Sequence, residues 1–355
     1  MKYSFKIGSV WGIPIELHLT FILLMIAVFA LTYPQLYFFV LILFLFVFVV
    51  FHELAHSVVA RHYRIKVRKI VLYPIGGVSE IEEIPENPRI EWRMAIAGPL
   101  TSFIIGGVLL PISLVTPFVS SGQTTTTIFQ TGSLTLDLAV LNIFLGAFNL
   151  IPAFPMDGGR VFRALLAERM KFSDATKYAA FIGRLFGIIL VGFSIIFLNP
   201  WLIIIGVFIY IGATEEAEQT IVSTTMARVR VKDVMNPEVA AVTPDTTLAD
   251  TMEILFKARY HDALVEKNGE LQGIVTWNDI MKIKPQQRST IRVEQLPKKQ
   301  VSAFPDESIL EAYRVMTTEK IDLIPVVDRE APTKVIGVLT SEAVNSAYEK
   351  AKNLR

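Results

Sequence analysis

Three long segments of this chain contain no Asp, Glu, Lys or Arg, and they limit the possible folds more than any other feature. They are Leu17–Phe51, Met94–Leu136 and Leu185–Thr214. Each exceeds the roughly 20 residues with which an α-helix crosses the hydrocarbon core of a bilayer. Because 52% of the 355 residues are hydrophobic and only 19% are charged, we expect a membrane protein rather than an ordinary soluble one.

Breaks within these segments divide them into separate helices. The first segment is interrupted at Tyr33-Pro34-Gln35, the third at Asn199-Pro200, and the middle one by the polar tract SSGQTTTTIFQTGS. The fold class that we expect is therefore a multi-pass α-helical membrane domain. It should contain about six transmembrane helices, at approximately 15–32, 36–61, 92–117, 134–150, 177–198 and 200–216.

Basic residues predict how these helices are oriented in the cell membrane. Lys and Arg beside membrane helices are retained on the cytoplasmic side. Segments 61–93 and 160–184 are rich in both, whereas the three connections at the opposite ends of the helices carry none. Both termini are therefore expected in the cytoplasm. The net charge of +1 says nothing about partners, because topology determines where the positive charge lies. We expect no nucleic-acid partner.

The second expected helix contains a metal-binding motif. Residues 52–56 read HELAH, which fits His-Glu-x-x-His, so His52 and His56 lie one turn apart on one helix face. Zinc suits this pair, and with no cysteine in the chain any metal must be held by nitrogen and oxygen. Glu53 is the expected general base, which takes a proton from a water whose pKa zinc lowers to roughly 7. The predicted chemistry is hydrolysis of a peptide bond.

The alternative is that these are chance polar residues inside a helix bundle. Two imidazoles and a carboxylate without partners in lipid cost several kcal/mol, which favours the metal site. His56 precedes Arg61 by five residues. It should therefore lie roughly 8 Å from the cytoplasmic end of its helix. The predicted active site is nearer the cytoplasmic face, where water can reach it.

A catalytic zinc commonly has three protein ligands and a fourth position open to water. Asp157 is the expected third ligand, because an anion suits a dipositive ion and this residue follows a membrane helix at its cytoplasmic end. Asp137 is the rival, but it lies near the outer end of the same helix. A helix cap is the alternative role for Asp157. Asn149 could donate a hydrogen bond to the substrate backbone or to a developing oxyanion, or serve in packing between helices.

The backbone around Asp157 is predicted to be irregular. Pro152 and Pro155 interrupt backbone hydrogen bonding, and Gly158-Gly159 allow left-handed turns. Irregular backbone is tolerated at membrane depth only where it is buried in protein or lines a watery cavity. An active site provides such surroundings.

Together these motifs resemble the site-2 protease family of intramembrane zinc metalloproteases. The resemblance covers residues 1 to about 216 and rests on HELAH, on AGP at 97–99 and on the pattern N-x-x-P-x-x-P-x-D-G-G at 149–159. It implies cleavage of membrane-anchored regulatory proteins in or near their transmembrane segments. It also implies a single zinc per chain, bound by the two histidines and the aspartate, with the glutamate as base: His52, His56, Asp157 and Glu53.

Residues 66–80, KVRKIVLYPIGGVSE, are β-rich and resemble the membrane-associated hairpin or loop near the active site of that family. An edge strand here could pair with an unwound substrate segment. A plain surface hairpin is the equal alternative.

The C-terminal part contains an internal repeat. Residues 239–280 align with 300–344, and each copy reads strand, helix, strand, strand, helix. One copy cannot bury both faces of so small a sheet, so the two should pack together. They resemble tandem CBS domains, which implies an α/β domain pair that binds adenine nucleotides such as ATP or AMP.

The first copy matches the ribose-contacting pattern of CBS domains at Gly273, Thr276 and Asp279. The second has Ala343 in place of the aspartate. Asp279 could equally cap the helix beside it, and the pair could have a purely structural or dimerising role. A homodimer through the CBS domains is a further expectation.

The expected domain organisation has four parts: a protease domain at 1–216, a linker at 217–227, and CBS domains at 228–286 and 287–355. The favoured function is an intramembrane zinc endopeptidase whose activity responds to the CBS pair. The alternative is an ion channel or transporter gated by that pair. HELAH with Asp157 disfavours the alternative, because a transport path gains little from a tight zinc site with a neighbouring base.

Overall fold

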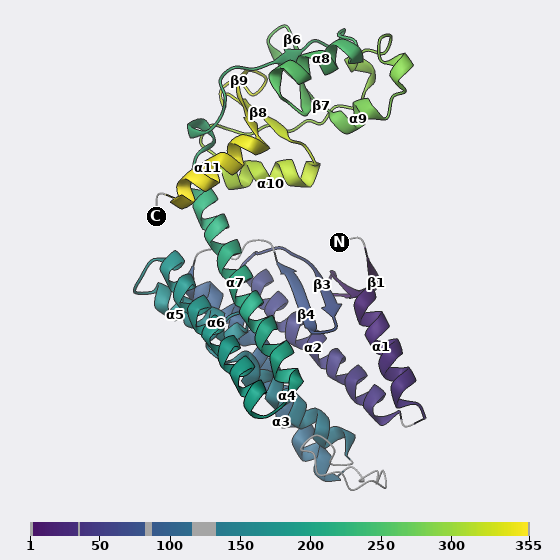
Figure 1. Cartoon of the computed structure of the whole chain (residues 1–355), viewed down its shortest axis with the longest axis vertical. Coiled ribbons are helices and arrows are strands. Elements are labelled where there is room, and N and C mark those ends of the chain that lie inside the picture. The colour runs from purple at the N-terminus through teal and green to yellow at the C-terminus, as the bar shows by residue number, and fades with distance from the viewer. Residues whose placement is uncertain (1–2, 35, 82–86, 116–132, 354–355) are drawn as a thin grey trace. The chain divides into compact units, whose positions relative to one another are not determined.

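The computed structural model describes residues 3–34, 36–81, 87–115 and 133–353. The chain forms two compact units, Met1–Glu218 and Gln219–Arg355. Long helices dominate the first unit, whereas the second combines short strands with helices (Figure 1). Of the polar tract between the third and fourth expected helices, only Ser133 lies within the described residues.

Helices occupy all six of the regions where apolar segments predict them. Their bounds are α1 Leu19–Thr32, α2 Tyr37–His62, α3 Pro88–Val115, α4 Leu134–Asn149, α6 Phe172–Ile196 and α7 Pro200–Arg228. Within the described part of the chain, α2, α3, α6 and α7 are long and apolar enough to cross a membrane. The other two, α1 and α4, are apolar but shorter. Residues 217–227, expected as a linker, are the C-terminal part of α7.

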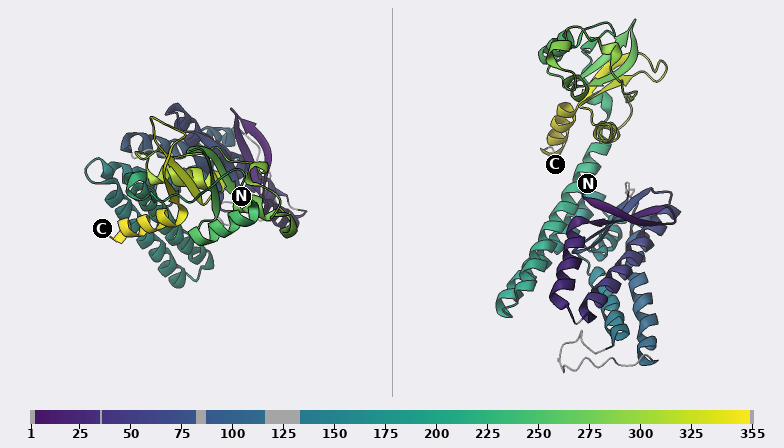
Figure 2. Two further views of the ribbon diagram at one scale, coloured as in Figure 1. Left: turned by 90° about the horizontal axis from the view of Figure 1, so that it is seen from above. Right: turned by 90° about the vertical axis from the view of Figure 1, so that its right-hand side faces the viewer.

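A four-stranded sheet lies beside one end of α1 and α2 (Figure 2). Its strands are β1 Ser4–Val10, β2 Ile13–His18, β3 Val67–Tyr73 and β4 Gly76–Ile81, in the order β1-β2-β3-β4. Only the β2–β3 pair is parallel. The expected β-rich hairpin at 66–80 is thus confirmed as β3 and β4, and β4 is an edge strand.

The expected start of the first helix at residue 15 is wrong, because residues 13–18 form β2. Ile13 and Ile15 are buried at alternate positions, which is the two-residue period of a strand with one covered face. Ile13 packs against Leu54 of α2. Helix α1 begins at Leu19, and the His18 ring nitrogen Nδ1 accepts a hydrogen bond from a backbone amide of its first turn.

Residues 150–156 have no regular structure and lead into the short helix α5, Asp157–Ala167. The irregular stretch therefore ends earlier than the glycines suggest. Gly158 and Gly159 are helical and not left-handed, so that expectation is wrong. They are needed for space, because a methyl group on Gly158 would overlap the backbone of Leu150 and Ile151.

The second unit contains the expected repeat. The first copy comprises β5 Ala241–Val242, α8 Leu248–Ala258, β6 Asp262–Lys267, β7 Glu270–Thr276 and α9 Trp277–Met281. The second comprises α10 Ile309–Glu319, β8 Leu323–Val327, β9 Val335–Thr340 and α11 Ser341–Asn353. Its first strand is reduced to a single bridge between Ala303 and Val326.

Asp262 connects the two copies of the repeat. Its carboxylate accepts hydrogen bonds from the backbone amides of Trp277 in its own copy and Asp322 in the other. Leu264 also packs against Leu323 and Val338 of the second copy. The copies therefore share apolar and polar contacts, as expected for two half-domains that cannot bury their sheets alone.

Candidate active site

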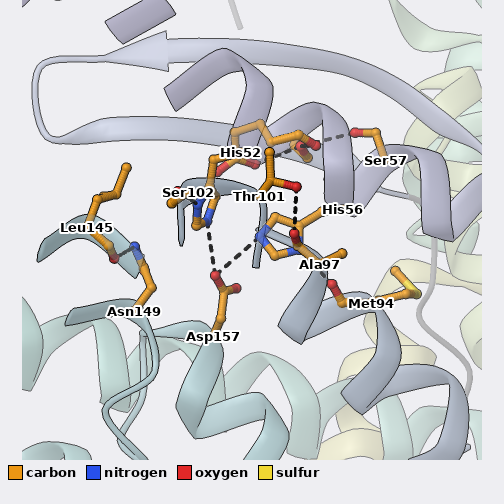
Figure 3. A network of polar contacts seen from close by, with 12 residues as sticks. His52, His56, Ser57, Met94, Ala97, Thr101, Ser102, Leu145, Asn149 and Asp157 are labelled. Carbon is orange, nitrogen blue, oxygen red and sulfur yellow. Dashed lines mark hydrogen bonds and ion pairs between the residues drawn. The ribbon is translucent and has the colours of Figure 1, made fainter. Parts of the chain in front are cut away.

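The side chains of His52, His56 and Asp157 meet in the first unit (Figure 3). The Asp157 Oδ2 atom lies 3.1 Å from His52 Nε2 and 3.2 Å from His56 Nε2. Both histidines are buried on α2, and Asp157 is the first residue of α5. Asp157 follows His52 by 105 positions and His56 by 101 positions in the sequence. The fold thus brings together three potential metal-binding atoms from distant segments.

Hydrogen bonds fix the orientation of both imidazole rings. His56 Nδ1 lies 2.7 Å from the carbonyl oxygen of Met94, and His52 Nδ1 lies 2.9 Å from the hydroxyl of Ser102. A carbonyl only accepts, so His56 carries a proton on Nδ1, and the neutral ring then has its lone pair on Nε2. This arrangement is typical of metal-binding histidines. Both partners belong to α3.

The absence of a side chain at Gly98 keeps the space beside the two histidines open. A methyl group there would overlap the Nε2 atoms of His52 and His56. Nitrogen and oxygen ligands about 2.0–2.1 Å from a tetrahedral zinc lie roughly 3.4 Å from one another. The contacts of Asp157 with the two rings are close to that spacing. Two imidazoles and a carboxylate are also a donor set that catalytic zinc commonly takes.

Glu53 lies next to this cluster and points toward the sheet. Its Oε2 atom accepts a 2.7 Å hydrogen bond from the hydroxyl of Ser79 in β4. The metal-binding atoms of Glu53 and the two histidines lie within 4.8 Å of one another. The carboxylate is therefore held close to the histidine nitrogens by an element that the motif itself does not include.

Asn149 lies at the C-terminal end of α4, beside the cluster but separate from it (Figure 3). Its Nδ2 atom donates a 3.0 Å hydrogen bond to the Leu145 carbonyl of its own helix. No hydrogen bond joins it to His52, His56 or Asp157 among the described residues. The rival aspartate, Asp137, accepts a hydrogen bond from Tyr37 near the N-terminal end of α4, away from the histidines.

A buried ion-pair network holds α5, which the sequence analysis does not anticipate. Arg163 of α5 donates two hydrogen bonds to Glu91 of α3, and both side chains are almost fully buried. Arg160 pairs with Glu216 of α7 at 3.2 Å. A signal was available, because the charges at 91 and 216 lie within or beside apolar helices, where isolated charges are costly.

In the second unit, Thr276 and Asp279 are close together. The Thr276 hydroxyl accepts from the Asp279 backbone amide and donates to the Asp279 carboxylate at 2.6 Å. Thr276 is thus the N-cap of α9, while Asp279 lies in its first turn. Lys282 also bonds the carboxylate and, with Thr276, lowers the pKa of Asp279. In the second copy, the Thr340 hydroxyl caps Ala343, which offers no carboxylate.

Comparisons with known proteins agree with this architecture. Residues 40–137 and 123–190 match the model of peptidase family M50, and residues 231–285 and 293–350 match the CBS domain model. A zinc metalloprotease of Methanocaldococcus jannaschii is 38% identical over 327 residues, which cover 91% of each chain. These matches favour the protease over the channel or transporter.

Two solved structures are also similar to parts of the chain. The site-2 protease from M. jannaschii is 43% identical and covers 61% of this chain and 95% of its own, with a TM-score of 0.48. A CBS protein solved in complex with AMP is 25% identical and covers 35% of this chain and 98% of its own, with a TM-score of 0.31.

Proposed function

This chain belongs to the site-2 protease family, peptidase family M50, and is a zinc metalloprotease of the membrane with a C-terminal CBS pair; on that premise we propose that it hydrolyses peptide bonds in or near transmembrane segments of membrane-anchored regulatory proteins. The observation that carries this proposal is the convergence of the Asp157 carboxylate on the Nε2 atoms of His52 and His56. The side chain of Glu53 lies beside them.

In the proposed mechanism, His52, His56 and Asp157 would hold a single zinc ion. Zinc, when bound, supplies a Lewis acid for the scissile carbonyl and acidifies water. Glu53 takes a proton from the attacking water and delivers it to the leaving amine. The Ser79 hydroxyl donates a hydrogen bond to Oε2 of this carboxylate, so we assign proton transfer to the other oxygen, Oε1. Asn149 would have to release the Leu145 carbonyl before its amide could bind the substrate backbone.

Strand β4 is the proposed docking element for the substrate. It pairs with β3 on one side and is an edge of the sheet. A transmembrane helix must unwind before its peptide bonds can be hydrolysed, and an edge strand offers free backbone groups to the unwound segment. Ser79 lies in β4 and bonds Glu53, so a substrate strand on this edge would lie close to the proposed base.

We propose that α1 and α4 also cross the membrane, which makes six spans. Their lengths of 14 and 16 residues suit a bilayer that is locally thin around the protein. The basic residues of segments 61–93 and 160–184 support a cytoplasmic location for both termini and the CBS pair. We assign the protease domain to 1–216, the linker to 217–227 and the CBS domains to 228–286 and 287–355.

The CBS pair is proposed to bind an adenine nucleotide, such as ATP or AMP, and to regulate cleavage. Asp279 would accept hydrogen bonds from the ribose hydroxyls, with Thr276 beside it. Lys282 bonds the Asp279 carboxylate and, by lowering its pKa, keeps it ionised, which supports this assignment. CBS pairs also associate with one another, so we further propose a homodimer through these domains.

The proposal is tested by cleavage of a single-span model substrate in detergent by wild type and Glu53→Gln, with bound zinc quantified in both. We expect wild type to cleave, and the variant to retain zinc without cleaving. Glu168→Gln is the matched control, because Glu168 is exposed at the end of α5. Equal cleavage by wild type and Glu53→Gln would refute the assigned base. Absence of zinc from both would refute the assigned metal centre.

A further inference from the structure

A strongly basic pocket lies where α2 ends and the chain turns toward β3. It has a volume of about 530 Å³ and is lined by the side chains of Arg61, Arg64, Lys66 and Arg68, together with Trp11 and its neighbours. All four basic residues are exposed. The described residues that line the pocket include no Asp or Glu. Such a cluster creates a positive potential that favours an anionic ligand.

Two of these cations are suited to an external ligand. Arg61 donates to the backbone carbonyl of Trp11 and fixes the wall of the pocket, and Arg68 has an interaction of its own. Arg64 and Lys66 do not occur in the ion pairs of the described residues. Arg64 also has a φ of 61°, an uncommon backbone conformation for a non-glycine residue, which turns the chain at the pocket.

Trp11 forms the aromatic rim of the same pocket. It is 69% exposed and occupies a turn between β1 and β2 with a φ of 48°, followed by Gly12 with a φ of 80°. Hairpin turns of this kind favour Asn, Asp or Gly at such positions. An aromatic residue here therefore gains little within the fold. Its exposed indole suits the boundary between lipid chains and headgroups, where Trp is enriched.

Further exposed apolar side chains lie on and before strand β1, between Trp11 and the N-terminus. Tyr3, Phe5 and Ile7 are each more than half exposed. Phe5 and Ile7 belong to β1, which is an edge strand of the sheet, and Tyr3 directly precedes it. The pocket directly follows α2, a 26-residue helix apolar enough to span a membrane. The end of such a helix is expected at the level where headgroups meet the hydrocarbon core.

We propose that this pocket binds the phosphate-bearing headgroup of an anionic phospholipid. Arg64 and Lys66 contact the phosphate, while Trp11 and the exposed side chains of β1 contact the acyl chains. The site anchors the β1–β2 hairpin at the membrane surface. It depends on the membrane location of the chain and is independent of the proposed peptide-bond hydrolysis.

The test uses the full-length protein in neutral detergent. Native mass spectrometry measures the affinity for phosphatidylglycerol, phosphatidylcholine and inorganic phosphate, for wild type and Arg64→Gln/Lys66→Gln. Each basic residue near an anionic lipid surface contributes to the binding free energy, so the loss of both charges in Arg64→Gln/Lys66→Gln should weaken phosphatidylglycerol binding about 25-fold. Arg169→Gln/Lys171→Gln removes the same charge from exposed positions in another basic segment and should change the affinity less than twofold.

Two further arms separate the lipid from other ligands. Arg64→Lys/Lys66→Arg preserves the charge and should retain most of the affinity for phosphatidylglycerol. Trp11→Ser should weaken the binding of phosphatidylglycerol but leave the binding of inorganic phosphate unchanged. Equal loss in the control pair would mean that net charge, not this pocket, governs binding. Equal affinity for phosphatidylcholine, or displacement of the lipid by millimolar phosphate, would overturn the proposal. Cleavage by Glu53→Gln is measured in a separate experiment. Failure of the lipid-binding proposal can therefore be told apart from failure of the proposed function.

Discussion

The hydroxyl of Ser79 donates a 2.7 Å hydrogen bond to Glu53 Oε2, and so connects the edge strand β4 to the carboxylate that we assign as general base. One element would therefore have two tasks. It is the strand that we propose to bind an extended substrate segment, and it orients the carboxylate that we assign as the base. A displaced β4 would disturb substrate binding and proton transfer together.

Removal of this hydrogen bond should lower kcat without loss of zinc. We expect Ser79→Ala to reduce kcat roughly 10- to 100-fold, because a hydrogen bond to a charged group contributes about 1.5–3 kcal/mol. Ser79→Thr retains the hydroxyl and should keep most of the activity. Steady-state cleavage with parallel zinc analysis measures both. Unchanged kcat in Ser79→Ala would show that Glu53 does not depend on this contact.

Ser102 should control metal affinity through His52. Loss of the partner at His52 Nδ1 frees the ring to rotate, and such partners commonly contribute 10- to 100-fold to metal affinity. Competition with a zinc chelator should therefore show a zinc affinity about 10- to 100-fold lower in Ser102→Ala. Ser113→Ala is the control, because this serine lies in the same helix and bonds the Leu110 carbonyl. Equal effects of the two substitutions would contradict the assigned role.

Separation of the buried pair Arg163–Glu91 should destabilise the membrane domain. Arg163→Met leaves the Glu91 carboxylate buried without its main partner, which costs about 3–5 kcal/mol. Arg163→Met/Glu91→Met removes both charges and should recover much of that loss. Thermal unfolding in detergent gives the ranking. If the double variant is less stable than Arg163→Met, the pair does not behave as a coupled unit.

Nucleotide binding should depend on Asp279, and the contribution of this residue should stay constant over a wide pH range. Lys282 and Thr276 hold the pKa of Asp279 below its usual value of 3.8. The carboxylate is therefore ionised from pH 8 to pH 5, and its contribution is lost only when the pH falls through that lowered pKa. Calorimetric titration with ATP and AMP should show about tenfold weaker binding to Asp279→Asn.

Asp250→Asn is the matched control for this prediction. Asp250 lies in the first turn of α8 and bonds its N-cap Thr247 at 2.7 Å, as Asp279 bonds Thr276. It should not change nucleotide affinity. If the two variants weaken binding equally, Asp279 acts as a helix-terminal residue and not as a ribose ligand. A marked change between pH 8 and pH 5 in the ratio of wild-type to Asp279→Asn affinity would also contradict the assignment.

Local sequence patterns predicted the helices and the meeting of Asp157 with the histidines. Apolar runs longer than the thickness of a bilayer leave little choice of structure, and HELAH fixes two histidines one turn apart. Strands β1 and β2 were missed because β2 runs directly into an apolar helix, which hides the alternation of Ile13 and Ile15. The contacts of Ser79 and Ser102 could not be predicted, since single serines in unrelated segments give no pattern.

The unequal CBS copies have a consequence for the shape of any response to nucleotide. With a carboxylate at Asp279 in one copy and Ala343 in the other, each chain would offer one complete position of the kind that we propose for ribose. Independent single sites fill along a hyperbola, so occupancy rises gradually over roughly two orders of magnitude in concentration. The activity of a protease governed in this way would change gradually with the adenine-nucleotide concentration of the cell. It would not switch on or off at a threshold concentration.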